Sequence, residues 1–210
     1  MTKEANLLVF GDTEEKNHGL ILFVGKEPNN SLDRTVEVGS YGADWSDSGD
    51  GTSCNFWNRM YSHAGATVGM SAKSLRCICA GLGSSPLVVT DLSPMSLDGR
   101  FSIAGKKKIR KQISITDFEQ HVEDVFSHAS LLRRVKLVWM AGHKGSGLDS
   151  GIPIFEAACR QVEIPFVHTA ALDSTRHSNA QRLAQLGSAE PIVREVILEF
   201  FSLNGFSAAG

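Results

Sequence analysis

The sequence lacks any apolar stretch long enough to cross a bilayer, which would need about 20 residues. Residues 1–6 also lack the basic-then-apolar pattern of a secretory signal. These absences argue against membrane and secreted proteins. We therefore expect a cytoplasmic protein that has no membrane partner.

Cysteine is scarce and follows no metal-binding pattern. The four cysteines include no CxxC pair, and the spacing of Cys77 and Cys79 does not suit an iron–sulfur cluster. His121, Asp124 and His128 share one helical face and could bind a metal ion, but a solvated surface is the commoner origin of such a trio. We expect no metal and no cofactor. Buried, reduced thiols are expected at Cys54, Cys77, Cys79 and Cys159.

Neither sign of charge is in excess, because 21 Lys and Arg residues stand against 23 Asp and Glu residues, for a formal net charge of −2. Any nucleic-acid contact must therefore come from a local basic patch. The candidate is the run Lys106–Lys108, which is ordinarily a solvated loop and matters only if a phosphate backbone is bound. The glycine-rich stretch 142–147 fits neither the P-loop nor the GxGxxG pattern, and no GxSxG motif occurs.

Apolar runs without alternation are the main structural signal, since they are typical of strands covered on both faces. Such runs lie at Leu20–Val24, Leu87–Thr90, Val135–Ala141 and Ile164–Val167. Helical patterns lie between them, with a capping box at Thr116 and Glu119, a helix at Ile152–Val162, and a last helix capped by Ser188 with Pro191 in its first turns. Alternating strands and helices predict an α/β fold, a three-layer αβα arrangement around a central, mainly parallel four-stranded sheet.

Two segments, Ser31–Ser53 and Ser93–Ser114, show little periodicity. Loops of that length inside a compact domain are usually functional or mobile. The sequence contains no internal repeat and no dividing linker. We expect one domain over residues 1–210.

Polar side chains follow each expected strand, and in chain order the exits carry Glu27, Asp91, His143 and His168. Parallel strands end at one edge of a sheet, so these groups would converge there. Together they could supply a general base and a donor to developing negative charge. The alternative is that strand ends are polar because they meet water.

The order of motifs resembles that of the uracil-DNA glycosylase superfamily over most of the chain. Gly25-Lys26-Glu27-Pro28 is similar to its first motif, a Gly-x-x-Pro turn whose third position carries the catalytic carboxylate or amide in several families. Asn55–Met60 resembles the Asn-x-Phe-Trp helix start of mismatch-specific members, and Leu87–Pro94 resembles the strand whose exit reads the flipped base. His168–Asp173 resembles the final motif, of the His-Pro-Ser-Pro-Leu-Ser type.

The resemblance implies a monofunctional DNA glycosylase that flips a pyrimidine out of DNA and leaves an abasic site. Glu27 would activate water or stabilise the sugar cation, and His168 would donate to the departing base. The base pocket would be formed by Asp91, Tyr41, Trp45, Phe56 and Asn55. DNA would be contacted by the wedge Ala171-Leu172 and by Lys106, Lys107, Lys108 and Arg176. We expect a monomer that binds single- or double-stranded DNA.

The expected base depends on Asp91, because uracil-specific relatives typically carry an amide at this strand exit. An ionised carboxylate only accepts hydrogen bonds, so it would accept from the N4 amino group of cytosine and repel O4 of uracil. Polar residues in the segment 31–53, such as Asp44 and Asp47, would suit a sugar-like group at C5 of the base. A bulky hydroxymethylcytosine derivative of phage DNA, removed in antiphage defence, is therefore a candidate substrate.

Other functions stay open on the sequence alone. One is a uracil or mismatch-specific glycosylase in base-excision repair. Another is an N-glycosidase of free nucleosides, in which the wedge and the lysine run would have no role. A third is a catalytically silent reader of modified DNA.

Overall fold

The computed structural model describes residues 8–11, 17–25, 55–94, 103–142, 145–170 and 178–206, and at 8–11, 55–58 and 103 it gives the backbone alone. Its centre is a five-stranded sheet in the order β1-β3-β2-β4-β5. The strands are β1 (Leu8–Gly11), β2 (Leu20–Gly25), β3 (Ser84–Asp91), β4 (Val135–Ala141) and β5 (Phe166–Thr169). The last four are parallel to one another, which confirms the predicted parallel sheet. β1, which was not predicted, adds an antiparallel edge to β3.

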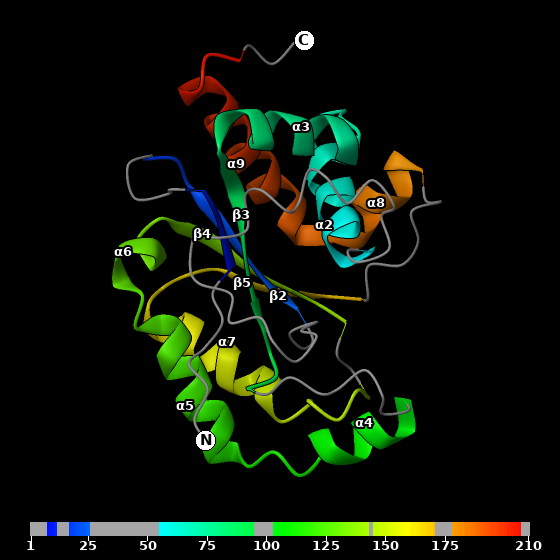
Figure 1. Cartoon of the computed structure of the whole chain (residues 1–210), viewed down its shortest axis with the longest axis vertical. Helices are drawn as coiled ribbons and strands as arrows, with labels where there is room; N and C mark the ends of the chain where they lie inside the picture. The colour runs from blue at the N-terminus through cyan, green and yellow to red at the C-terminus, as the bar shows by residue number, and fades with distance from the viewer. Residues whose placement is uncertain are drawn as a thin grey trace.

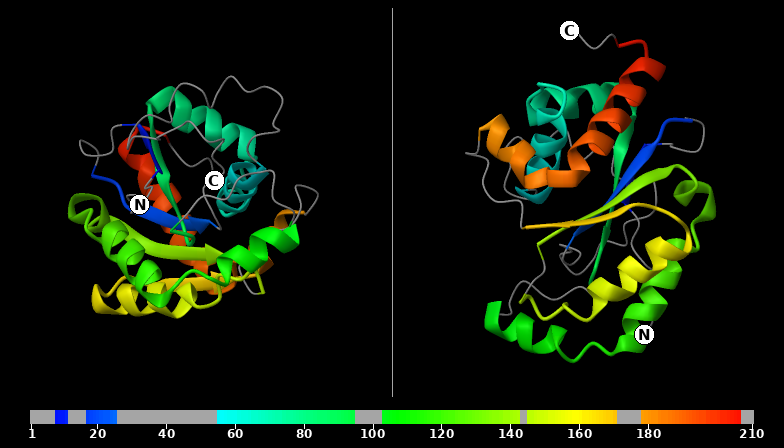
Figure 2. Two further views of the ribbon diagram at one scale, coloured as in Figure 1. Left: turned by 60° about the horizontal axis from the view of Figure 1, so that its bottom comes forward. Right: turned by 180° about the vertical axis from the view of Figure 1, so that it is seen from behind.

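Helices cover both faces of the sheet, which confirms the three-layer αβα prediction (Figures 1 and 2). One layer contains α2 (Asn55–Ala66), α3 (Ala72–Leu82), α8 (Asn179–Leu186), the short 3₁₀ turn η1 (Gly187–Ala189) and α9 (Glu190–Leu203). The other contains α5 (Ile115–Phe126), α6 (Ala129–Leu132) and α7 (Gly151–Gln161). The remaining helix, α4 (Ile103–Arg110), lies at the lower right of Figure 1.

Side chains of the central strands alternate between two separate cores, so the apolar runs have no polar face. Ile21, Phe23 and Trp139 belong to the core under α2, α3 and α9. Leu22 and Met140 belong to the core under α5 and α7. All six residues of β2 are buried, as expected for a central strand with helices on both faces.

The capping box of α5 differs from the predicted one by two residues. Ser114, not Thr116, is the N-cap, and Asp117, not Glu119, is its reciprocal partner. The Ser114 hydroxyl accepts from the Asp117 backbone N–H (3.1 Å), and the Asp117 carboxylate accepts from the Ser114 N–H (3.0 Å). Phe118 and Val125 lie on the buried face of this helix.

Three further predictions need adjustment. The segment Ser93–Ser114, expected to be a loop, contains α4 and the N-cap residue of α5. β5 begins at Phe166, because Pro165 has no N–H and joins the ladder only through its carbonyl, which accepts from Val138 (2.9 Å). Ser188 lies inside η1, and Ala189 takes the N-cap position of α9. The predicted proline in the first turn of α9 and the predicted helix at Ile152–Val162 are confirmed, the latter within one residue.

The described cysteines are free thiols. Cys79 and Cys159 are buried, as predicted, and burial raises the pKa of each to about 12. Cys77 is exposed, so the prediction of burial is wrong there, and Cys54 lies outside the described residues. Among the helices that the structure describes, none is long and apolar enough to cross a membrane.

Two helical glycines offer a matched test of this packing. A Cβ at Gly65 would lie 2.7 Å from the backbone oxygen of Met70, whereas a Cβ at Gly81 would meet nothing within 4 Å. We expect Gly65→Ala to lower the free energy of unfolding by about 1–3 kcal/mol, since backbone must move. Gly81→Ala should raise it by about 0.4–1 kcal/mol, because alanine restricts the unfolded chain. Urea denaturation measures both, and equal effects of the two changes would contradict this packing.

Candidate functional site

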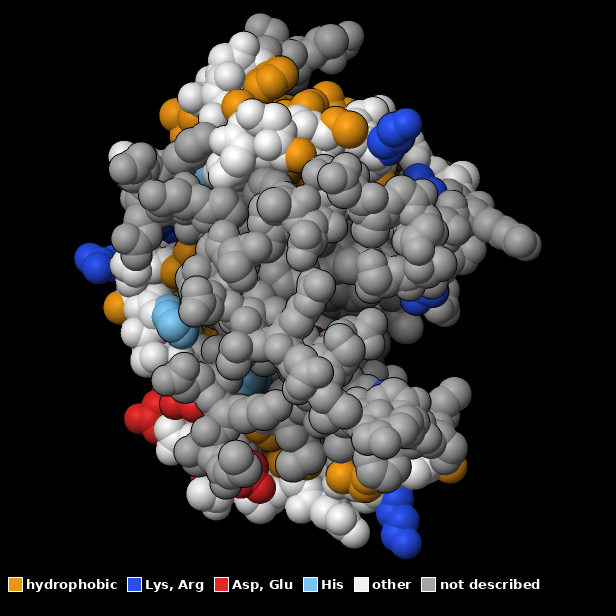
Figure 3. All heavy atoms as spheres, viewed as in Figure 1, with side chains coloured by type: hydrophobic (Ala, Val, Ile, Leu, Met, Phe, Trp, Pro, Cys, Tyr) orange, Lys and Arg blue, Asp and Glu red, His pale blue; other side chains and the backbone are white. Residues whose placement is uncertain are grey.

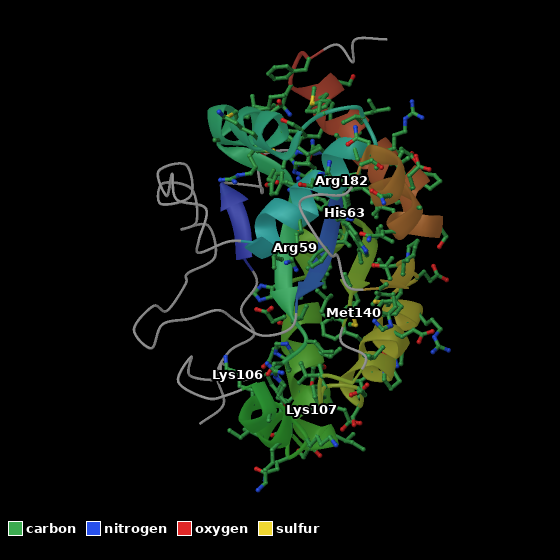
Figure 4. The ribbon with its side chains drawn as sticks, turned by 90° about the vertical axis from the view of Figure 1, so that its right-hand side faces the viewer. Arg59, His63, Lys106, Lys107, Met140 and Arg182 are labelled. Atoms are coloured by element: carbon green, nitrogen blue, oxygen red, sulfur yellow. The ribbon has the colours of Figure 1, made fainter. Side chains whose placement is uncertain are left out.

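The four parallel strands end along one edge of the sheet. Figure 4 shows the molecule from the right-hand side of Figure 1, the side on which this edge lies. Gly25 of β2 pairs with Asp91 of β3, and the next amide, Leu92 N–H, donates to the Gly25 carbonyl (2.8 Å). At the other two exits, the Gly142 N–H donates to the Thr169 carbonyl (3.0 Å). This carboxyl edge, where open α/β sheets usually bind ligands, is the candidate site.

Asp91 is the last residue of β3 and is only 6% exposed. The register places it in one row with Gly25, so its side chain belongs to the face of the sheet that α2 covers. Its backbone carbonyl accepts a 2.6 Å hydrogen bond from Nε2 of His121 on α5. A buried carboxylate therefore stands at the site on a backbone that is hydrogen-bonded from the opposite helical layer.

His121 is a buried partner of this strand exit, so its assignment to a solvated metal-binding or surface trio is wrong. It is 5% exposed, and its ring packs edge-on against Phe155 with centroids 6.4 Å apart. Burial lowers the pKa of His121, and the hydrogen bond to the Asp91 carbonyl and the charge of Asp124 only partly oppose this shift. The ring is therefore neutral near pH 7, with its hydrogen on Nε2.

His168 lies at the other end of the same edge, on β5. It is half-buried, and its Nε2 donates to the carbonyl of Gly142, which follows β4. Because a carbonyl only accepts, Nε2 carries a hydrogen and is not available to a ligand in this arrangement.

The structure does not bring His168 and Asp91 into contact. β2 and β4 lie between their strands, so the two backbones are roughly 14 Å apart at the usual strand spacing. His168 also pairs with Met140, in the row that faces the α5 and α7 core. A ligand that reaches both residues must cross the exits of β2 and β4.

A hydrogen-bonded group beneath the edge connects α2, α8 and the strands, and sequence reasoning missed it. His63 is fully buried, its Nδ1 donates to the Arg59 carbonyl (2.8 Å), and its Nε2 lies 2.6 Å from the side-chain amide of Gln185. Its ring meets Trp139 edge-on, and Trp139 Nε1 donates to the Thr169 hydroxyl (3.0 Å). The only signal for it in the sequence is the four-residue spacing of Arg59 and His63 on one helix.

Basic side chains stand on both sides of the carboxyl edge. In Figure 4, Arg59 of α2 and Arg182 of α8 lie on one side of Met140, and Lys106 and Lys107 of α4 lie on the other. The Arg59 Nε is buried and makes no hydrogen bond within the described structure. Sequence reasoning found the lysines but not the two arginines, which stand singly among neutral residues.

The lysine run belongs to a helix that is fixed to the site. Arg110, at the end of α4, is 5% exposed and donates to the Ser146 carbonyl in the segment after β4 (3.4 Å). Asp149 braces that segment by accepting from the Gly145 N–H (2.8 Å), a hydrogen bond that also lowers the pKa of its carboxyl. Lys107 and Lys108 are exposed on this anchored helix.

Surface charge differs between the two helices at the lower end of the molecule. α5 carries Asp117, Glu119, Glu123 and Asp124 and no lysine or arginine. Acidic side chains gather at the lower left of Figure 3, over α5, and a basic side chain projects at the lower right, beside α4. The basic helix is hydrogen-bonded to the segment after β4, and the acidic helix is hydrogen-bonded to the end of β3.

The remaining candidate residues are not placed. Glu27 follows β2 by two positions and lies outside the described residues, as do Tyr41, Trp45, His143, Ala171, Leu172 and Arg176. Asn55 and Phe56 begin α2, where the backbone alone is described. Within the described parts of the chain, no group of three or more His, Cys, Asp or Glu residues could hold a metal ion.

No model of a known protein family matches the chain, and no curated protein matches it.

The buried imidazole of His121 should make stability depend on pH. In the unfolded chain the ring takes a proton near its ordinary pKa of 6.5, whereas in the folded chain it does so only at lower pH. The unfolded state thus binds more protons in that window, so the free energy of unfolding falls as pH drops below about 6.5. His121→Gln should remove this part of the fall in urea titrations from about pH 8 to about pH 5. Parallel pH curves for the two proteins would contradict a buried, neutral His121.

Proposed function

We propose that the chain is a monofunctional DNA glycosylase that removes a pyrimidine, by preference a modified cytosine. The observation that carries the proposal is the register of β2 and β3. It sets the buried carboxylate of Asp91 beside Gly25, two residues before Glu27. A base-reading acceptor and a catalytic carboxylate would then come from neighbouring strand exits.

The chemistry needs few groups. The bond between C1′ of the sugar and the base nitrogen breaks, and the sugar gains cationic character that the Glu27 carboxylate stabilises. A water oxygen then bonds to C1′, and the proton released from water goes to the solvent or the departing base. The products are the free base and an abasic site.

Asp91 favours cytosine as the substrate base. Asp91 is 6% exposed at the strand exit, and a carboxylate accepts hydrogen bonds from donors such as the N4 amino group of cytosine. Uracil presents O4 at that position, and two acceptors would repel each other. The substituent at C5, in this proposal a hydroxymethyl group or a larger derivative of it from phage DNA, would be met by the segment 31–53.

The basic side chains on both sides of the edge support DNA as the substrate form. A flipped nucleotide leaves its duplex, so its flanking phosphates must be held while the base enters the site. Arg59 and Arg182 stand on one side, and Lys106 and Lys107 on the other. A free nucleoside has no phosphates and would make no use of them.

His168 takes a restricted role in this proposal. Its Nε2 is bound to the Gly142 carbonyl, so donation to the departing base would fall to Nδ1 and would require that nitrogen to carry a hydrogen.

Base release from oligonucleotides tests the proposal. Duplexes and single strands that carry 5-hydroxymethylcytosine, its glucosylated form, cytosine, uracil or a thymine mismatch are incubated with the protein and then treated with alkali. We expect strand breaks at a modified cytosine and few at uracil. Asp91→Asn should raise cleavage at uracil relative to modified cytosine by about tenfold or more, because an amide both donates and accepts.

Glu27→Gln separates a glycosylase from a reader of modified DNA, since the variant should keep DNA binding and lose base release. Cleavage at plain uracil by the native protein, with none at any modified cytosine, would contradict the role of Asp91. If the protein released base only from free nucleosides, its substrate would be a nucleoside and not DNA.

The salt dependence of binding tests the lysines. Each phosphate contact contributes about 0.9 to the slope of log affinity against log salt concentration. The double change Lys106→Ala and Lys107→Ala should therefore flatten the slope by about 1–2, measured by fluorescence anisotropy. The control is Lys136→Ala, which removes an exposed lysine at the amino end of β4. An unchanged slope for the double variant, or an equal change in the control, would exclude α4 as a DNA contact.

A further inference from the structure

We propose that His121 is a positioning residue that fixes the direction of the Asp91 carboxylate and thereby sets base selectivity. The inference rests on the proposed function and names a group that does not itself touch the substrate. The inference depends on the peptide group that joins Asp91 to Leu92.

Both poles of this peptide group are hydrogen-bonded to different elements. Its N–H, from Leu92, donates to the Gly25 carbonyl of β2 (2.8 Å). Its C=O, from Asp91, accepts from His121 Nε2 of α5 (2.6 Å). With both poles held, the peptide plane cannot rotate, so the bond from the Cα of Asp91 to its Cβ keeps one direction.

The His121 bond is made by a carbonyl that lies beyond the described pairing of β1 with β3. Along a strand, successive residues direct their N–H and C=O to opposite sides, so the Asp91 carbonyl points away from β2, towards the side of β1. The described pairing of β1 with β3 ends at Leu8 and Val89, two residues before Asp91. His121 thus satisfies a carbonyl that the described ladder does not reach.

His121 is itself held firmly enough to act this way. It is 5% exposed and packs against Phe155 of α7, and α5 starts at a complete capping box formed by Ser114 and Asp117. A displacement of about 1 Å at a reacting or reading group can cost about a hundredfold in rate. Loss of this hydrogen bond should therefore lower base selectivity more than it lowers the stability of the fold.

The experiment compares His121→Leu, which removes the donor, with His121→Gln, whose amide can still donate to the carbonyl. His128→Leu is the control, because His128 precedes α6 and its side chain makes no capping hydrogen bond there. One readout is the ratio of kcat/KM for duplexes with 5-hydroxymethylcytosine and with uracil. The other is amide hydrogen exchange at Leu92, with Gly142, whose amide bonds across the other pair of strand exits, as the reference.

We expect His121→Leu to lower the selectivity ratio by about tenfold and to speed exchange at Leu92 by roughly tenfold, with Gly142 unchanged. His121→Gln should restore most of both, and His128→Leu should alter neither. Unchanged exchange at Leu92, or faster exchange with full selectivity, would overturn the inference. Equal acceleration at Leu92 and Gly142 in both His121 variants would also overturn it, because the role would then be general stability.

Failure of the proposed function is distinguishable from failure of this inference. If the native protein releases no base from any duplex, the glycosylase proposal fails, and the selectivity role of His121 fails with it. The exchange at Leu92 then still decides whether His121 fixes the Asp91 peptide.

Discussion

The pairing of β2 with both of its neighbours is the constraint on which the rest of the structure depends. Each of its six residues is buried, and it is hydrogen-bonded to β3 on one side and to β4 on the other. That double register decides which residues of the three strands end side by side. If β2 slipped by one residue, each of its side chains would point into the opposite core, and Gly25 would no longer pair with Asp91.

The site combines groups from both helical layers at this edge. From one layer, α2 provides Arg59 and the buried His63, which connects it to α8 through Gln185. From the other, α5 reaches the end of β3 through His121. The α2 group connects two helices of its layer, whereas the His121 hydrogen bond connects α5 directly to a strand end.

Much of this fold follows from the sequence, because strands buried on both faces leave an unmistakable apolar run. Val135–Ala141 has the same bounds in prediction and structure. β1 could not be found this way, since four residues are too short for a periodic pattern and its position depends on pairing with β3. α4 was missed because its lysines hide the helical spacing of a few apolar residues.

The candidate site was predictable only where it coincides with strand ends. Asp91 and His168 were found because they follow apolar runs. His121 looked like part of a polar surface, since its burial depends on how α5 meets β3 and α7. Arg59 and His63 carry no local pattern, because their neighbours at the site come from distant parts of the chain.

The opposite charges of α4 and α5 create a local charge asymmetry between these two helices. A net charge of −2 repels a polyanion only weakly, and at physiological salt this repulsion fades within about 8 Å. Inside that range this asymmetry would favour an approach with α4, and not α5, facing the polyanion. Because Arg110 attaches α4 to the segment after β4, the same orientation would bring that strand exit towards the polyanion.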